Sequence, residues 1–218
     1  MNRNQTFIFY GLSAINIASG LLETEWLGYI TKPLLMITLA VFYYQHTRAT
    51  FSKRDRLVLF ALFFSCLGDT FLMFQQLNPD YFLMGLGAFL LGHVCYILLF
   101  QQEGKSRHFR WLPFISYACL LLFFLLNRIP ADFKIPVILY SVVITLMGIR
   151  ASERQVNDKS YEVVLIGAVL FIISDSLIAL NKFVVSVPLA GLWIMSTYVV
   201  AQYLIIHGLL INSMLKNH

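Results

Sequence analysis

The sequence predicts an all-α, polytopic membrane protein with eight transmembrane helices, and three observations lead to that prediction. First, 59% of the 218 residues are hydrophobic and 12% are charged, about half the charged fraction of an average soluble domain. Second, apolar runs long enough to cross a bilayer recur along the whole chain. Third, the loops between them alternate between many and few basic residues. Because little polar sequence is left over, residues 1–218 are predicted to form a single integral membrane domain.

The apolar runs are separated by short polar segments. They cover about residues 5–22, 27–46, 56–76, 82–101, 110–127, 133–150, 161–181 and 187–214. The breaks carry turn or charge signals, such as Asn78-Pro79-Asp80 and the basic segment 48–56. The division between the first two runs depends on Glu23 and Glu25 alone. The first run is followed by no cleavage motif of small residues, so we expect it to stay as the first helix.

The distribution of lysine and arginine predicts the orientation. Of the 16 Lys and Arg residues, 12 fall in one set of alternate loops, including Lys105 and Arg107, and 4 fall in the other. Because basic residues accumulate in cytoplasmic loops, both termini are predicted to be cytoplasmic, N-in and C-in. The same distribution accounts for the net charge of +5 without nucleic-acid binding. A compact multi-pass chain with such loops is typical of the bacterial inner membrane.

Several common site types have no signature in this sequence. The cysteines Cys66, Cys95 and Cys119 lie inside apolar runs, without the spacing of a zinc site, and are read as reduced packing residues. The Gly-x-Ser-x-Gly element of serine hydrolases and the His-Glu-x-x-His element of zinc hydrolases do not occur. We therefore expect no cofactor and no metal, although Asp69, His93 and Asp175 are residue types from which a metal site could be built.

A weak internal repeat relates the two halves of the chain. At an offset of 106 residues, LGDTFLMF (67–74) aligns with ISDSLIAL (173–180), which places Asp69 on Asp175. Four spans in each half would give two halves with parallel topology, as in the parallel repeats of some transporters. Chance similarity between apolar segments explains the alignment equally well.

Charged residues in the middle of apolar helices are costly and mark candidate functional sites. Asp69 and Asp175 lie about 13 and about 14 residues from the predicted cytoplasmic ends of their spans, so both reach the same depth beyond the midplane. His93 lies near the middle of its own span. Polar groups at membrane depth must face one another or a wet cavity, so we expect one shared polar pocket. Its further members are predicted to be Asn16, Lys32, Tyr96, Tyr198 and Gln202.

These residues leave several interpretations open. Individually, Asn16 can join two helices, Lys32 can extend to the interface, and the tyrosines can be packed aromatics. Together they favour either an enzyme using acid–base chemistry or a proton-coupled transporter of small molecules or lipids, because both need intramembrane acids. A non-catalytic scaffold would not explain the two buried aspartates.

Five segments resemble the YhhN-like, or lysoplasmalogenase, family of eight-helix membrane proteins. Their Gly-Asp, Gly-His-x-x-Tyr, Ser-Asp and Tyr-x-x-x-Gln elements are specific as an ordered set. The first helix and residues 105–165 match in hydropathy only. The matching segments are TKPLL (31–35), SCLGDTFLM (65–73), GLGAFLLGHVCYILLF (85–100), SDSLIAL (174–180) and STYVVAQYLI (196–205).

The resemblance implies hydrolysis of the vinyl-ether bond of lysoplasmalogens, which are alkenyl-glycerophosphocholines or -ethanolamines, to a fatty aldehyde and a glycerophospho-base. The partners it implies are a lysophospholipid substrate and membrane lipid. Such chemistry needs a proton donor and a carboxylate that stabilises a cation and activates water. Asp69 and Asp175 fit these two roles, in an order that the sequence does not assign, and His93 fits a proton relay. The expected substrate contacts are Lys32 for the phosphate, Tyr198 and Gln202 for water or the glycerol oxygen, and Asn16, Tyr96 and Ser174.

Overall fold

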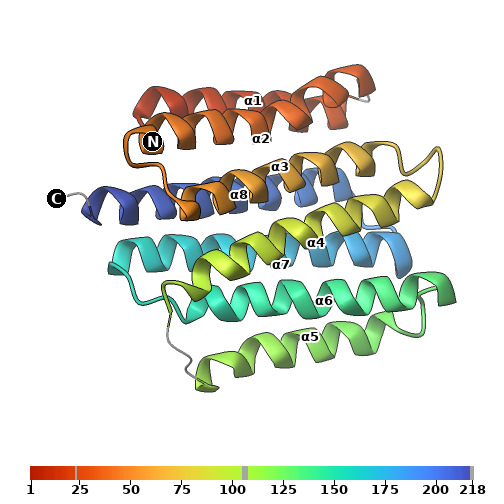
Figure 1. Ribbon diagram of the computed structural model, residues 1–218. Helices are drawn as coiled ribbons and strands as arrows, with labels where there is room; N and C mark the ends of the chain where they lie inside the picture. Colours follow the sequence, from red (N-terminus) through yellow and green to blue (C-terminus); the bar gives the residue numbers. More distant parts are fainter. Residues whose placement is uncertain (23, 105–107, 217–218) are drawn as a thin grey trace.

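The computed structural model describes residues 1–22, 24–104 and 108–216, and within these ranges it contains helices and no strand (Figure 1). Each predicted apolar run coincides with one α-helix to within a few residues. Glu23, Lys105 and Arg107 lie outside the described residues. The helices are α1 (Arg3–Leu21), α2 (Glu25–Thr47), α3 (Lys53–Met73), α4 (Asp80–Gln101), α5 (Leu112–Leu125), α6 (Ala131–Ser152), α7 (Asp158–Phe183) and α8 (Ala190–Lys216), with short 3₁₀ turns at Arg48–Thr50 and His108–Trp111.

Local sequence explains where the helices start. At the start of α3, Ser52 and Asp55 form a reciprocal capping box, in which the Ser52 backbone N–H donates to Asp55 Oδ2 at 2.8 Å. The Tyr43 hydroxyl of α2 donates to the other carboxylate oxygen of Asp55 at 2.7 Å. The cap therefore also fixes the turn between α2 and α3. At α7, the side chain of Asn157 accepts a hydrogen bond from the backbone N–H of Lys159.

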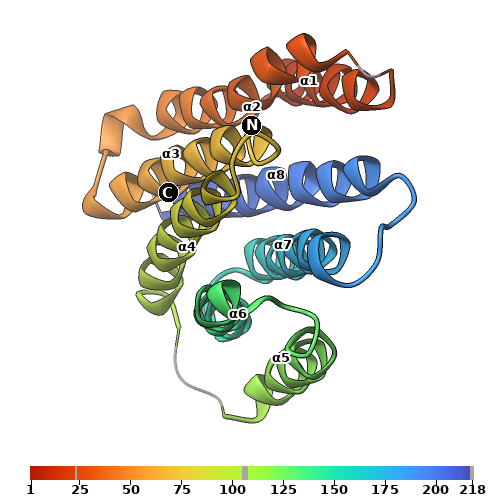
Figure 2. The same ribbon diagram turned by 90° about the vertical axis from the view of Figure 1, so that its right-hand side faces the viewer.

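The helices form an elongated bundle with α1 and α2 at one edge and α5 at the opposite edge (Figures 1 and 2). In the centre, α3 packs on α4 and α7 packs on α8. In addition, α2 contacts α8 and α6 contacts α4. The second helix of each half thus packs on the fourth helix of the other half, which is the reciprocal pattern expected of two related halves. Both termini lie at the same end of the bundle (Figure 1).

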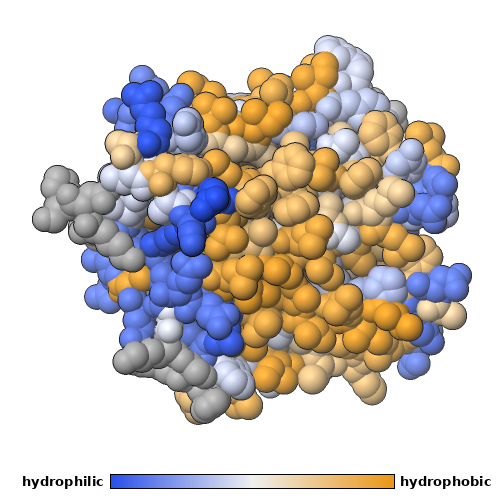
Figure 3. Space-filling view, viewed as in Figure 1, coloured by the Kyte–Doolittle hydropathy of each residue, from blue (hydrophilic) through white to orange (hydrophobic). Residues whose placement is uncertain are grey.

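The surface has the character of a membrane protein. In the described ranges, six helices are long and apolar enough to cross a bilayer, namely α2, α3, α4, α6, α7 and α8. The apolar segment Phe109–Leu125, which includes α5, is shorter, and α1 is not among the six. Length and composition therefore account for six of the eight predicted spans. Figure 3 shows a broad hydrophobic band between two polar ends. Large apolar side chains are exposed on several helices, such as Phe123 at 73% and Ile135 at 78%.

Glycine permits a close contact between α7 and α8. A Cβ atom on Gly167 would lie 2.9 Å from the Ala201 carbonyl oxygen and 3.0 Å from the Ile205 backbone nitrogen. These neighbours are backbone atoms, which cannot rotate away. Small residues at such crossings let membrane helices approach closely enough for extensive van der Waals contact.

We expect Gly167→Val to destabilise the protein by about 1–3 kcal/mol, because the added side chain forces α7 and α8 apart. Thermal unfolding of the purified protein in detergent measures the effect. Gly87→Ala is the matched control, because a Cβ on Gly87 meets no atom within 4 Å. Equal melting temperatures for the two variants would show that the close α7–α8 contact is dispensable.

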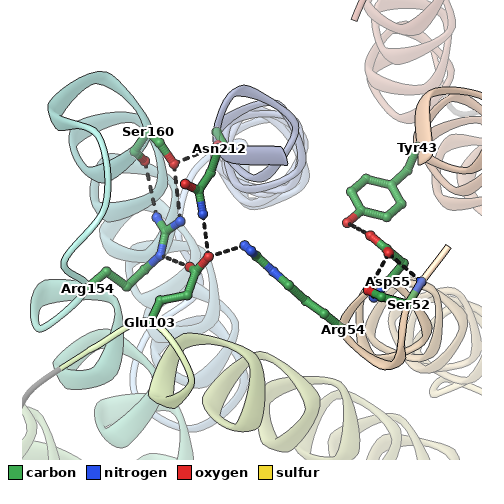
Figure 4. A network of polar contacts seen from close by, with 9 residues as sticks. Tyr43, Ser52, Arg54, Asp55, Glu103, Arg154, Ser160 and Asn212 are labelled. Carbon is green, nitrogen blue, oxygen red and sulfur yellow. Dashed lines mark hydrogen bonds and ion pairs between the residues drawn. The ribbon is translucent and has the colours of Figure 1, made fainter. Parts of the chain in front are cut away.

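A buried ion network joins four parts of the chain at the end of the bundle where α4 finishes (Figure 4). The Glu103 carboxylate contacts Arg54 of α3, and accepts from Arg154 Nε at 2.7 Å and from the Asn212 amide of α8. Arg154 also donates to Ser160. Both Arg154 and Glu103 are almost fully buried, with side-chain exposures of 0% and 2%. Burial lowers the pKa of Arg154, and the Glu103 carboxylate opposes that shift.

Candidate functional site

The first polar cluster of the bundle interior is built around Asp175 of α7. The Nε2 atom of His93, on α4, lies 3.2 Å from Asp175 Oδ2 and 2.9 Å from the hydroxyl of Tyr140, on α6. The Tyr140 hydroxyl donates a hydrogen bond to the same carboxylate oxygen. His93 is 1% exposed, and its Nδ1 has no hydrogen-bond partner in the described part of the chain. An acid, an imidazole and a phenol from three helices therefore form one triangle.

Two members of this Asp175 cluster, Asp175 and Tyr140, line a narrow cavity between α4, α5, α6 and α7. The cavity has a volume of about 50 Å³ and is lined mainly by aliphatic and aromatic side chains. Tyr117 of α5 donates to Ser176 of α7 across it at 2.9 Å. The Asp175 carboxylate thus faces a narrow space with mainly apolar walls. Its polar lining residues are Tyr117, Tyr140, Ser141, Thr145, Asp175 and Ser176.

The second cluster is built around Asp69 of α3. Lys32 Nζ, from α2, lies 3.5 Å from Asp69 Oδ1, and the Tyr198 hydroxyl, from α8, donates to Oδ2 at 2.7 Å. Asp69 is 2% exposed. Its charge is therefore balanced by an ammonium group inside the bundle. Lys32 and Asn16 line one side pocket near this cluster, and the Asn16 amide donates to the Thr31 hydroxyl at 2.8 Å.

The remaining predicted residues make helix-to-helix contacts. The Tyr96 hydroxyl of α4 donates to Gln202 Oε1 of α8 at 2.8 Å, and Gln202 Nε2 donates to Ser65 Oγ of α3 at 3.0 Å. The Ser174 hydroxyl of α7 donates to the Ile194 carbonyl oxygen of α8 at 3.0 Å. These bonds fix the spacing of the helices that carry both aspartates.

The structure thus places the predicted residues in two clusters with aromatic rings between them. The Phe171 ring lies 4.7 Å from the His93 ring and 5.4 Å from the Tyr198 ring, centroid to centroid. Each aspartate contacts the second helix of its own half and the fourth helix of the other half. Asp69 does so through Lys32 and Tyr198, and Asp175 through Tyr140 and His93, which matches the reciprocal packing of the helices.

Two features of these clusters bear on the sequence predictions. Tyr140 was missed, although a polar group near the middle of run 133–150 meets the criterion that selected the other residues. Asp69 belongs to the second cluster, whereas His93 and Asp175 belong to the first. Consistent with this separation, no three His, Cys, Asp or Glu side chains of the described residues are grouped so that they could hold a metal ion.

An apolar belt, six candidate spans and polar clusters inside the bundle define an integral, multi-pass membrane protein. The model of the YhhN family matches residues 27–209, and the chain belongs to that family. It is 32% identical to bovine lysoplasmalogenase TMEM86A over 189 residues, which covers 83% of this chain and 77% of the relative. It is 31% identical to mouse lysoplasmalogenase TMEM86B over 200 residues, with 90% and 81% covered. No solved structure matches it with significance.

Proposed function

We propose that this protein is a membrane hydrolase that cleaves the vinyl-ether bond of lysoplasmalogens. The observation that carries the proposal is the Asp175–His93–Tyr140 cluster, of which Asp175 and Tyr140 line an apolar cavity. The lysoplasmalogenase relatives support the same substrate. A single-chain lipid has one hydrocarbon chain to place in such a cavity, and its vinyl ether begins where that chain meets the glycerol.

The proposal includes eight spans with both termini in the cytoplasm. The 19 residues of α1 extend about 28 Å at 1.5 Å per residue, close to the ~30 Å hydrocarbon core. Phe109–Leu125 extends about 25 Å by the same measure, so it reaches across with a local adjustment of the bilayer. Basic residues are in excess at the end of the bundle that carries both termini, which supports this orientation. The proposed location is a bacterial inner membrane.

The different partners of the two aspartates suggest different roles. Asp69 faces the Lys32 ammonium group, so its negative charge is held in place as a fixed carboxylate. Asp175 faces the imidazole of His93, and the two share a proton that can be given away. We therefore assign proton donation to the Asp175–His93 pair, and to Asp69 a longer-range electrostatic stabilisation of the cation that acts across the Phe171 ring.

The reaction then proceeds in balanced steps. The proton passes to the β-carbon of the vinyl ether, whose π electrons form the new C–H bond, and an oxocarbenium ion results. Water adds to the α-carbon of this ion and returns a proton to the Asp175–His93 pair. The hemiacetal collapses to a fatty aldehyde and a free glycerol hydroxyl. One water is consumed, and the enzyme is regenerated without a cofactor.

The side pocket that contains Lys32 and Asn16 is the proposed contact for the glycerophosphate. Lys32 is 19% exposed there while its ammonium group also meets Asp69, so a phosphate oxygen can approach it from the pocket. Tyr198 is proposed to hold the Asp69 carboxylate in position, because its hydroxyl donates to Oδ2. Gln202, Tyr96 and Ser174 are proposed to position the helices around the substrate, because their hydrogen bonds join those helices.

The direct test is hydrolysis by the purified protein in detergent with deuterated water as solvent. We expect a fatty aldehyde that carries one deuterium at C2, and an equal amount of glycerophospho-base, both measured by mass spectrometry. A saturated ether lysolipid and an ester lysolipid are the controls, and neither should be cleaved. Cleavage of the ester would indicate a lysophospholipase. Absence of aldehyde, combined with uptake of the lipid into proteoliposomes, would indicate a transporter.

A further inference from the structure

The cavity beside Asp175 is closed very differently at its two ends. At one end, the rings of Phe82, Phe133 and Phe183 pack on one another with centroids 5.7–5.9 Å apart. At the other end, the wall contains the small side chains of Ala118, Ser141 and Thr145. These three residues line both the cavity and a second space on the outer side of α5 and α6.

This second space, the α5–α6 groove, is apolar and opens on the bundle surface. It has a volume of about 390 Å³. Its wall includes Ile115, Cys119 and Leu122 of α5 and Val142 and Leu146 of α6, and Trp111 and Arg150 complete it. Most of this wall is apolar and therefore suits contact with a lipid chain.

The wall between cavity and groove offers no polar barrier. The Ser141 hydroxyl donates to the Val137 carbonyl oxygen at 2.8 Å, and the Thr145 hydroxyl donates to the Ser141 carbonyl oxygen at 2.6 Å. Both hydroxyls are therefore satisfied within α6. The third member, Ala118, has a methyl group only. A hydrocarbon chain that crosses this wall displaces no hydrogen-bonded group.

Helix α5 is also the least firmly seated helix around the cavity. Of its 14 residues, all of which the structure describes, Leu125 alone is buried. Figure 2 shows α5 at the edge of the bundle, beside α6 and away from the central helices. Its hydrogen bond from Tyr117 to Ser176 links it to the helix that carries Asp175. A small shift of α5 would widen the gap at Ala118 without disturbing the centre.

We infer that the α5–α6 groove holds the far end of the substrate's hydrocarbon chain, which reaches it through the gap between Ala118, Ser141 and Thr145. This inference rests on the proposed function. A lipid chain extends over about 15 Å, half of the ~30 Å hydrocarbon core. From Asp175 to Ile172, at this end of the cavity, α7 rises by only about 4.5 Å. A chain that points this way therefore leaves the cavity and continues into the groove, and the small side chains of the gap set the chain-length preference.

Filling the gap tests the inference with a series of alkenyl lysolipids of 8 to 18 chain carbons. We expect Ala118→Phe and Ser141→Leu to lower kcat/KM by about tenfold or more for the longest chains, because several methylenes lose their site. The shortest chain ends before the gap, so its kcat/KM should change less than about twofold. Leu120→Phe is the matched control on α5, because Leu120 lines neither space, and it should behave as wild type.

A second variant distinguishes the direction of the chain. Ala179→Phe narrows the cavity on the side of the aromatic end and should affect all chain lengths alike. If Ala179→Phe impairs long chains selectively while Ala118→Phe affects all lengths equally or none, the chain runs toward Phe183 and the inference is wrong. If the wild-type protein releases no aldehyde from any chain length, the proposed function fails instead.

Alkylation of Cys119 gives a readout that does not depend on activity. Cys119 is exposed and lines the groove, whereas Cys66 and Cys95 are half-buried elsewhere and serve as internal references. A saturated 16-carbon ether lysolipid, which lacks the vinyl ether, should slow alkylation of Cys119 by N-ethylmaleimide severalfold, and an 8-carbon analogue should not. Equal rates with both lipids would overturn the inference. If the 16-carbon lipid protects Cys119 but the protein hydrolyses none of the alkenyl lysolipids, the inferred site for the hydrocarbon chain stands and the proposed enzymatic function is wrong.

Discussion

Asp175→Asn is expected to lower kcat by at least about 100-fold, the usual contribution of a general acid–base group. The amide has the size of the carboxyl group and still accepts the hydrogen bond from Tyr140, but it cannot share a proton with His93. The loss should therefore appear in kcat rather than in folding. Aldehyde release measures it, with melting temperature and elution volume as checks on the fold. Asp80→Asn, at the exposed start of α4, should retain full activity. Near-full activity of a folded Asp175→Asn variant would refute the proposed acid.

Asp69→Asn should cause a similar loss for a different reason. The substitution removes the fixed negative charge and leaves the Lys32 ammonium group without its counter-ion, so stability falls as well. The double variant Asp69→Asn/Lys32→Met separates the two effects when its kcat is compared with that of Lys32→Met alone, because Lys32 is also the proposed phosphate contact. The double variant should regain the stability of the wild type, because both charges are gone, while its kcat stays low. Recovery of kcat in the double variant would mean that Asp69 serves only as the counter-ion of Lys32.

Hydropathy was sufficient to predict the helices of this protein because the bilayer leaves few alternatives for the backbone. Each run corresponds to one helix, and the depth argument found residues that the structure indeed buries, among them Asp69, His93 and Gln202. The two spans that the length and composition criterion does not include are α1 and α5. Asn16, Ser13 and Ser19 lower the hydropathy of α1, whereas α5 has only 14 residues.

The hydrogen-bond partners of each buried polar group were not predictable. The depth of a residue in the membrane does not show toward which neighbouring helix its side chain points. Asp69 and Asp175 were expected to share a pocket, yet their neighbours depend on which helices are adjacent. The structure shows that α2 packs on α8 and α6 packs on α4, and these contacts decide the neighbours of each aspartate. The aromatic side chains between the two clusters, among them Phe171, could not be predicted either. In the sequence, a phenylalanine within an apolar run cannot be distinguished from any other packing residue. A hydropathy pattern fixes position along the membrane normal and leaves position in its plane open.

The buried ion network at Glu103 also could not be predicted from the sequence. Arg54 and Arg154 belong to the basic residues counted in the cytoplasmic loops, and that count depends on charge and not on burial. The structure places both against Glu103, with Arg154 fully buried. The carboxylate therefore holds together the start of α3, the end of α4 and the turn before α7. It also reaches α8 through Asn212.

Glu103→Ala is consequently expected to destabilise the protein by about 3–5 kcal/mol, because it leaves two arginines near each other without their shared counter-ion. Thermal unfolding in detergent should show a melting temperature lower by roughly 10 °C. Glu162→Gln, an exposed position on α7, is the control and should melt as the wild type.

The double variant Glu103→Gln/Arg154→Met tests whether burial of charge is the cause. Removing a buried charge together with its partner costs far less than removing one of them, so this variant should recover most of the lost stability. If it melts as low as Glu103→Ala, the uncompensated charge of Arg154 is not the cause of the loss. If Glu103→Ala itself melts as the wild type, the network does not hold the four segments together, and the helix contacts alone keep α3, α4, α7 and α8 in place around the two aspartates.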